Sequence, residues 1–174
     1  MDKISIERIQ TLHPSIRSKA ENDYLAANKL LPHGVRLRIT QALRTWDEQT
    51  ALYAQGRTKK GIIVTKAKAG DSWHNYGLAI DIVIILDTNN DGLFETASFK
   101  IDKYWITVAN YLKSQGWSWG GDWNTFKDYP HFEITHGLTL AEAKRRYQQR
   151  KFIGKSSYIT VRVLPKCGHN STKL

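Results

Sequence analysis

The sequence predicts one α+β domain in which a small central antiparallel sheet is flanked by helices. Three observations indicate this class. The chain has 174 residues, enough for a single hydrophobic core, and 41% hydrophobic with 24% charged residues is typical of a soluble globular domain. Helical and strand patterns alternate along it, but the central strands are not separated by the regular crossover helices of a parallel α/β sheet. No linker divides residues 1–151.

The first half of the chain carries two helical patterns with a strand pattern between them. We expect a helix over residues 13–31, where apolar side chains recur on one side. Residues 35–43 begin with alternating apolar and polar side chains, the pattern of a half-buried strand. A short helix should follow over residues 45–56, with Thr45 as its N-cap and Gly56 closing it.

The second half predicts two further strands, each followed by a helix. The β-branched run at residues 78–86 indicates a strand covered on both faces. Residues 101–116 have the pattern of an amphipathic helix that ends at a glycine. Residues 131–135 predict a short strand, and residues 139–151 a helix that opens with the Thr-x-x-Glu spacing of a capping box.

The positive charge of the chain is concentrated at its C-terminal end. The net charge is +10, Glu142 is the last acidic residue, and nine of the 26 basic residues follow it. We expect residues 152–174 to form a basic tail, with one added strand and then disorder, separate from the domain at residues 1–151. Such a segment favours an anionic partner (a membrane, a wall polymer or nucleic acid) or is simply solvated.

One carboxylate stands in an unusual place, because Asp81 lies inside the apolar run LAIDIVIIL. A buried carboxylate needs a cation, either an arginine or a metal ion shared with His74. Downstream, His131 offers a third ligand, and Asp128 three residues before it could act as a general base. Cys167 is the only cysteine, so a metal site must use histidine and carboxylate. The spacing alone leaves arginine and metal both open.

The motif SxHxxGxAxD at residues 72–81, followed by DxxH at residues 128–131, resembles a group of zinc peptidases. The group contains D-alanyl-D-alanine carboxypeptidases and L-alanyl-D-glutamate endopeptidases of bacteria and phages. ALRTWDEQTALYAQGR is similar to the arginine-bearing segment of this family, and GWSWGGDWNTFKDYPHFE resembles its endopeptidase branch. The resemblance covers roughly residues 5–150 and implies a hedgehog-like, D-Ala-D-Ala-peptidase-like fold.

The resemblance also implies roles for individual residues of a zinc peptidase domain at residues 1–151. Asp128 would be the general base, and Arg44 would steady the developing oxyanion or a substrate carboxylate. Ser72 and Gln49 would help to hold the substrate. The zinc ligands would be His74, Asp81 and His131.

The function that the resemblance implies is hydrolysis of the L-alanyl-D-glutamate bond in peptidoglycan stem peptides by zinc-activated water. A D-alanyl-D-alanine carboxypeptidase is the first alternative, and a non-enzymatic zinc-containing binding module is the second. We expect a monomer whose partner is peptidoglycan, with an anionic membrane or wall polymer bound through the tail and no specific nucleic acid. The N-terminal residues lack the apolar core of a signal peptide. We therefore expect synthesis in the cytoplasm and action on the cell wall after release, as in a phage or prophage endolysin.

A second candidate cofactor is Ca²⁺, suggested by the segment DTNNDGLFE. Asp87, Asn89 and Asp91 match the first, third and fifth positions of an EF-hand loop. The twelfth position is Ser98 instead of glutamate, although Glu95 could ligate from a shorter loop. An Asx-rich hairpin turn would account for the same residues without an ion.

Other residues near these motifs predict supporting roles. Glu133 should share a strand face with His131 and could orient it. The tryptophans of GWSWGGDW are expected to pack near the wall of the active site. The remaining histidines are interpreted as surface or capping residues: His13, His33, His136 and His169.

Overall fold

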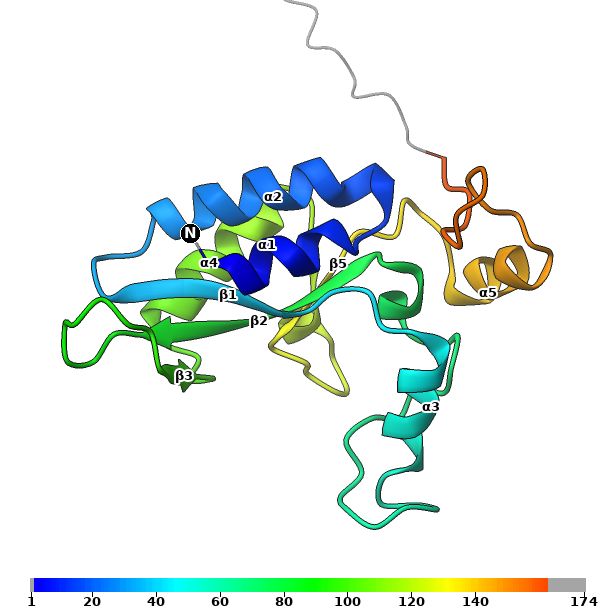
Figure 1. Ribbon diagram of the computed structural model, residues 1–174, viewed down its shortest axis with the longest axis horizontal. Coiled ribbons are helices and arrows are strands. Elements are labelled where there is room, and N and C mark those ends of the chain that lie inside the picture. The colour runs from blue at the N-terminus through cyan, green and yellow to red at the C-terminus, as the bar shows by residue number, and fades with distance from the viewer. Residues whose placement is uncertain (1, 163–174) are drawn as a thin grey trace, which may run out of the picture.

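The computed structural model describes residues 2–162, which form one α+β domain, and this confirms the predicted fold class (Figure 1). The helices are α1 (Lys3–Gln10), α2 (Pro14–Lys29), α3 (Trp46–Ala54), α4 (Lys103–Ser114) and α5 (Leu140–Gln148). The strands are β1 (Val35–Gln41), β2 (Ala79–Leu86), β3 (Thr96–Ser98), β4 (Ser118–Trp119) and β5 (His131–Glu133). Short 3₁₀ turns cover Trp73–Tyr76 and Gly120–Asp122.

The sheet is antiparallel and is centred on β2. Its strand order is β1-β2-β5-β4, and β3 also pairs with β2. One edge of β2 pairs with β1, while the other is shared by β5, opposite residues 79–81, and by β3, opposite residues 84–86. Residue 81 and residues 84–86 of β2 therefore have strand partners on both edges.

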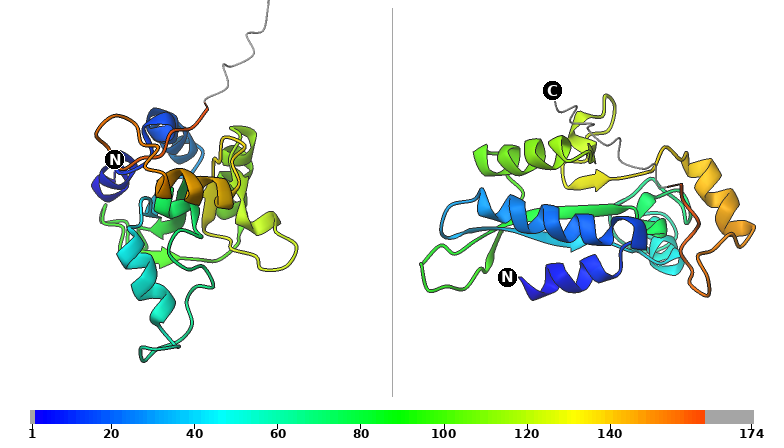
Figure 2. Two further views of the ribbon diagram at one scale, coloured as in Figure 1. Left: turned by 90° about the vertical axis from the view of Figure 1, so that its right-hand side faces the viewer. Right: turned by 90° about the horizontal axis from the view of Figure 1, so that it is seen from above.

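Helices α1, α2 and α4 lie side by side over one face of the sheet (Figure 2). Alternate side chains of β2 point to opposite faces. Ile80, Ile82 and Ile84 join the hydrophobic core that these helices cover. Asp81, one residue out of step with them, therefore points to the face away from the three helices.

The predicted short helix and its cap are confirmed in α3. The Thr45 side chain accepts a hydrogen bond from the Glu48 backbone N–H, and the Glu48 carboxylate accepts one from the Thr45 backbone N–H. Together, α3 and the loop after it, residues 46–70, project from the body of the domain (Figure 1). We call these residues the arm. The arm returns at Gly70, where a Cβ atom would lie 2.5 Å from the ring of Trp46.

The first part of the predicted tail packs on the domain. Within residues 152–162, Phe152 and Ile159 form an isolated antiparallel bridge, and Ile159 is fully buried. The predicted domain boundary after residue 151 stays a prediction. The disorder expected for the last ten residues concerns positions outside the described ones. Over the described residues, no helix combines the length and apolar character needed to span a bilayer.

Candidate metal centre and active site

His74 is presented by a tight turn that only glycine can complete. It lies in the 3₁₀ turn before β2, and Gly77 ends that turn with a left-handed φ of +67°. A Cβ on Gly77 would lie 2.8 Å from the backbone nitrogen of His13, which also donates a hydrogen bond to the Gly77 carbonyl. The close approach and the positive φ both favour glycine here. This turn directs His74 back toward β2.

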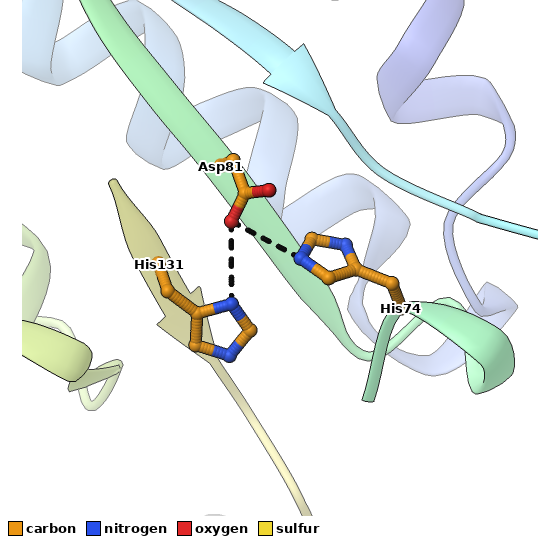
Figure 3. Close-up of side chains that lie close together, drawn as sticks. All are labelled: His74, Asp81 and His131. Atoms are coloured by element: carbon orange, nitrogen blue, oxygen red, sulfur yellow. Dashed lines mark hydrogen bonds and ion pairs between the residues drawn. The ribbon is translucent and has the colours of Figure 1, made fainter. Parts of the chain in front are cut away.

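The second and third candidate ligands are neighbours on the adjacent strands β2 and β5. Asp81 and His131 are directly opposite in the pairing of β2 with β5, so their side chains share a face. Figure 3 shows both converging with His74. The Asp81 Oδ1 atom is 3.1 Å from His74 Nε2 and 3.2 Å from His131 Nδ1. One potential ligand atom from each residue lies within 4.8 Å of the other two.

The outer nitrogen of each imidazole is held by an acceptor. His74 Nδ1 lies 2.8 Å from the carbonyl oxygen of Ala42, which can only accept. His131 Nε2 lies 2.9 Å from a carboxylate oxygen of Glu133, the residue expected to orient it. In the neutral imidazoles the outer nitrogens therefore carry the protons, and the inner nitrogens present lone pairs toward Asp81.

The electrostatics of the site favour a cation. Burial opposes ionisation of Asp81. When the imidazoles are protonated, however, the charge of His74 and the hydrogen bonds that both rings then donate hold the pKa of the Asp81 carboxyl well below the usual range. Burial alone would lower the pKa of His131, but its bonds to Asp81 and Glu133 raise that pKa to about 9. A proton on His131 and a divalent cation are therefore alternative ways of balancing these carboxylates.

The donor set of this cluster fits zinc. Two imidazole nitrogens and one carboxylate oxygen are the ligand types of catalytic zinc sites, which use three protein ligands and leave a fourth position for water or substrate. Within residues 2–162, this is the one group of three or more histidine, cysteine or acidic side chains close enough to share an ion. The arginine alternative is present as well, because Arg44 Nη2 lies 3.6 Å from Asp81 Oδ2.

Asp128 lies in the same cavity, which has a volume of about 580 Å³ and is also lined by the cluster, Arg44 and Ser72. Its backbone is fixed, because its N–H donates to the Gly120 carbonyl and its own carbonyl accepts from the His131 N–H. Among the described residues, nothing hydrogen-bonds to its carboxylate. Burial, and next the charge of Asp81, raise the pKa of Asp128 above the usual range. A raised pKa suits a general base that works near neutral pH.

Gln49 occupies a different place from the one expected of a substrate contact. It is completely buried and does not line the cavity. Its Oε1 accepts a hydrogen bond from Arg44 Nη1 at 3.0 Å, and its Nε2 donates to the Ala67 carbonyl at 2.8 Å. This geometry suits Gln49 to positioning Arg44 and the arm. Ser72 does line the cavity, and its contact with substrate stays a prediction.

The aspartate carboxylates of the candidate calcium loop accept hydrogen bonds from the backbone of the loop itself. Both Asp87 oxygens accept backbone N–H groups, from Asp91 and Gly92, at 3.1 and 2.9 Å. Asn89 and Asp91 are hydrogen-bonded to each other, and Glu95 is exposed. These bonds match the Asx-turn alternative, and Ca²⁺ binding stays a prediction.

Of the remaining histidines and the tryptophans of GWSWGGDW that the structure describes, only Trp123 lines the cavity. His13 is buried and accepts a hydrogen bond at the N-terminus of α2, whereas His33 is exposed. His169 lies outside the described residues. Trp117 and Trp119 are buried, and their indole N–H groups donate to Asp23 and to the Tyr129 carbonyl. Trp123 is 38% exposed, and its ring centroid is 5.4 Å from that of His131.

The sequence analysis did not identify the residues that form the outer wall of the cavity. Val64, Thr65, Lys66 and Ala67 of the arm line it, together with Phe126. No local signal identifies them, because the arm and the segment before β5 are brought together only by the fold.

Comparison with known proteins gives the same family from sequence and the same fold from structure. A family model described as D-alanyl-D-alanine carboxypeptidase matches residues 65–134. The chain is 46% identical over 131 residues to the peptidoglycan L-alanyl-D-glutamate endopeptidase CwlK of Bacillus subtilis (strain 168), covering 71% of this chain and 73% of the relative. It is 29% identical over 126 residues to the L-alanyl-D-glutamate peptidase of Listeria phage A118, covering 70% of this chain and 40% of that protein.

Among solved structures, the crystal structure of the L-Ala D-Glu endopeptidase ChiX of Serratia marcescens matches with a TM-score of 0.54. The match covers 78% of this chain and 89% of the other at 21% sequence identity, and it supports the likeness of fold.

Proposed function

This chain belongs to the D-alanyl-D-alanine carboxypeptidase family of metal-dependent peptidases, and we propose that it uses one zinc ion to hydrolyse the L-alanyl-D-glutamate bond of peptidoglycan stem peptides. The relatives above that carry an activity in their names are called L-alanyl-D-glutamate peptidases or endopeptidases. Peptidoglycan is therefore the substrate polymer, and the D-alanyl-D-alanine carboxypeptidase alternative is not favoured.

The observation that carries the proposal is the convergence of three ligand atoms beside an acid that is not one of them. His74, Asp81 and His131 would hold the ion, and Asp128 lines the same cavity. The chemistry that zinc supplies when bound is that of a Lewis acid, which polarises a carbonyl and makes a water molecule acidic near neutral pH. A structural zinc site is normally closed by four protein ligands. The open arrangement therefore argues against a purely structural ion in a binding module.

Asp128 would act as the general base. Its carboxylate takes a proton from the attacking water and passes it to the departing amine of the glutamate residue. Arg44 is held by Gln49 and lies beside Asp81. Its guanidinium would stabilise the negative charge that develops on the scissile carbonyl oxygen. Glu133 and the Ala42 carbonyl keep the two imidazoles in the orientation that presents lone pairs to the ion.

The biological setting belongs to the same proposal. Action on peptidoglycan places the enzyme at the cell wall, and the likeness to a phage peptidase supports a role as a phage or prophage endolysin. We propose that the enzyme acts as a monomer and that the basic residues after Glu142 add affinity for an anionic wall polymer or membrane surface.

Digestion of purified muropeptides, followed by mass spectrometry of the products, tests the proposed reaction. The expected products separate L-alanine from D-glutamate and leave the terminal D-alanyl-D-alanine bond intact. Release of terminal D-alanine alone would identify a carboxypeptidase, and unchanged muropeptides at full zinc loading would contradict peptidase activity.

Two variants separate the ion from the base. Asp128→Ala should retain about one zinc per chain and lose at least roughly a hundredfold in kcat, because a base serves the chemistry and not the coordination. Asp81→Asn should lose both zinc and activity. Metal content by atomic emission and turnover on the same preparations provide the readouts. Zinc loss in Asp128→Ala would make Asp128 a ligand instead.

A further inference from the structure

The outer part of the catalytic cavity is formed by two segments that are far apart in the sequence. On one side lies the stretch of the arm from Val64 to Ala67, and on the other lie Trp123 and Phe126. The two sides meet where Lys66 Nζ stands 4.9 Å from the centre of the Phe126 ring. Both residues are exposed, so this contact is at the solvent side of the cavity.

Lys66 is the one cation lining this cavity without a carboxylate partner among residues 2–162. Arg44, the other lining cation, lies beside Asp81. Asp71 also lines the cavity, but it pairs at 2.8 Å with Lys144. A lysine that is exposed to the cavity and not neutralised from within the protein can bind an anionic group of the substrate.

The backbone on both sides of Lys66 is fixed. Arg57 Nη2 donates a 3.0 Å hydrogen bond to the Thr65 carbonyl, and Thr65 Oγ1 accepts from the Ala67 N–H at 3.2 Å. The Ala67 carbonyl accepts from Gln49, the same buried amide that holds Arg44. One side chain therefore holds both the Arg44 guanidinium and the backbone next to Lys66, which reduces the entropy lost when a ligand is bound between the two cations.

We propose that Lys66 is a specificity-determining residue that binds the free carboxylate of the glutamate at the scissile bond. This inference rests on the proposed function. Glutamate has two carboxyl groups, and continuation of the peptide uses only one of them. The other is an anion unless it is amidated, and amidation removes the charge while keeping nearly the same shape. Lys66 thus makes the enzyme prefer stem peptides whose glutamate is not amidated.

The expected size of the preference follows from the kind of bond. A hydrogen bond between an ammonium and a carboxylate is stronger than one between an ammonium and a neutral amide. The loss of one such charged bond corresponds to roughly 10- to 100-fold in affinity. Because Lys66 lies on the outer wall and the proposed base and ligands lie deeper, the effect should fall mainly on KM.

The test uses two synthetic stem peptides that differ only in having a carboxylate or a carboxamide on that glutamate. The full chain loaded with zinc should cleave the carboxylate peptide with a kcat/KM roughly 10- to 100-fold higher. Lys66→Met should lose this preference by raising KM for the carboxylate peptide much more than KM for the carboxamide peptide. Lys66→Arg, which keeps a cation at this position, should retain the preference for the carboxylate peptide. Lys60→Met removes a charge from the same arm away from the cavity, and should behave as the unmodified enzyme does.

Each other outcome has a definite meaning. If Lys66→Met weakens cleavage of both peptides equally, Lys66 only packs the arm against Phe126 and the inference is wrong. The inference is also wrong if the unmodified enzyme treats the two peptides alike. If the unmodified enzyme cleaves neither peptide nor purified muropeptides, the proposed function itself fails, which the muropeptide digestion shows independently.

Discussion

The hydrogen bond between His131 and Glu133 shows how one residue outside the candidate ligand set can control a metal centre. Both side chains are mostly shielded, at 8% and 14% exposure, so water competes weakly for the bond. His131 would otherwise be free to rotate about its side-chain torsions, and its inner nitrogen would spend less time facing Asp81. Residues that hold metal ligands in this way commonly change metal affinity by about 10- to 100-fold.

Substituting Glu133→Ala should therefore weaken zinc binding by about 10- to 100-fold without removing any proposed ligand. Competition with a chromophoric chelator measures the affinity directly. Glu7→Ala, at an exposed glutamate of α1, is the matched control and should bind zinc as the unmodified chain does. Equal affinity in the Glu133 and Glu7 variants would mean that the strand alone orients His131.

The candidate site was predictable where its residues stand close together in the sequence. His74, Asp81 and His131 belong to short motifs, and Glu133 follows from the period of two in a strand. Lys66 and the positioning role of Gln49 were not predictable in this way. The partner of Lys66 is Phe126, and the partners of Gln49 are Arg44 and Ala67. These contacts are defined only after the arm folds back on the domain.

At the scale of elements, a chain of hydrogen bonds fastens residues 152–162 to the helices. His13 Nε2 lies 2.7 Å from the Ile159 carbonyl, which only accepts, so this nitrogen carries the proton of the neutral ring. His13 Nδ1 then accepts from Ser15, and Ser15 Oγ accepts from His136 Nε2. Burial, with the charges of His136 and Arg17, lowers the pKa of His13, so the folded state favours the neutral ring.

The lowered pKa of His13 predicts that the folded state loses stability on acidification. The unfolded chain binds a proton at His13 near its ordinary pKa of 6.5, whereas the folded chain binds it only at lower pH. Between these two pKa values the unfolded state holds more protons, so the free energy of unfolding falls as pH drops below about 6.5. Urea denaturation at a series of pH values should show a shallower pH dependence for His13→Asn than for the unmodified chain.

Comparing the two proteins isolates His13, because both retain His74, His131 and His136. The variant should also be less stable at pH 7, by about 1–3 kcal/mol, because the Ile159 carbonyl loses its donor while buried. Identical pH profiles would show that the ring does not titrate differently on unfolding.

The elements that the sequence predicted are those with a strong pattern of their own. Helices α2, α3, α4 and α5 and strands β1, β2 and β5 lie within the expected segments. Helix α1 was not predicted, because it has only eight residues and its one buried aliphatic side chain is Ile9. Its stability comes from packing rather than from its own pattern. Strands β3 and β4 have three and two residues, and only their pairing partners define them.

At the scale of the whole molecule, the excess positive charge and the candidate active site lie in different parts of the sequence. The acidic and basic residues nearly balance up to Glu142, and the excess of positive charge follows it. Two of these later cations are used within the domain, since Lys144 pairs with Asp71 and Arg146 with Glu142. Others are exposed and form no ion pair within residues 2–162, among them Arg145, Lys151 and Lys155.

A triple variant tests the role of this charge. Changing Arg145, Lys151 and Lys155 to Gln should weaken binding to isolated cell walls at low ionic strength and reduce its dependence on salt. Cleavage of a soluble peptide and the melting temperature should stay nearly unchanged, because none of the three lines the cavity. The charge-matched control changes three exposed lysines on other elements: Lys29, Lys100 and Lys103.

Sedimentation with walls over a series of salt concentrations measures both variants. Greater loss in the first variant supports a localised basic surface. Equal loss in the two would mean that only the net charge of the molecule matters.

The direct pairing of Asp81 with His131 links ion binding to the alignment of the sheet. A slip of β5 by a single residue would turn His131 toward the helices and leave Phe132 on the face that carries Asp81. Such a misaligned chain would keep most of its secondary structure, yet it would have no place for the ion. Metal uptake during refolding would therefore report on strand registration, which spectroscopic measures of helix or strand content do not distinguish.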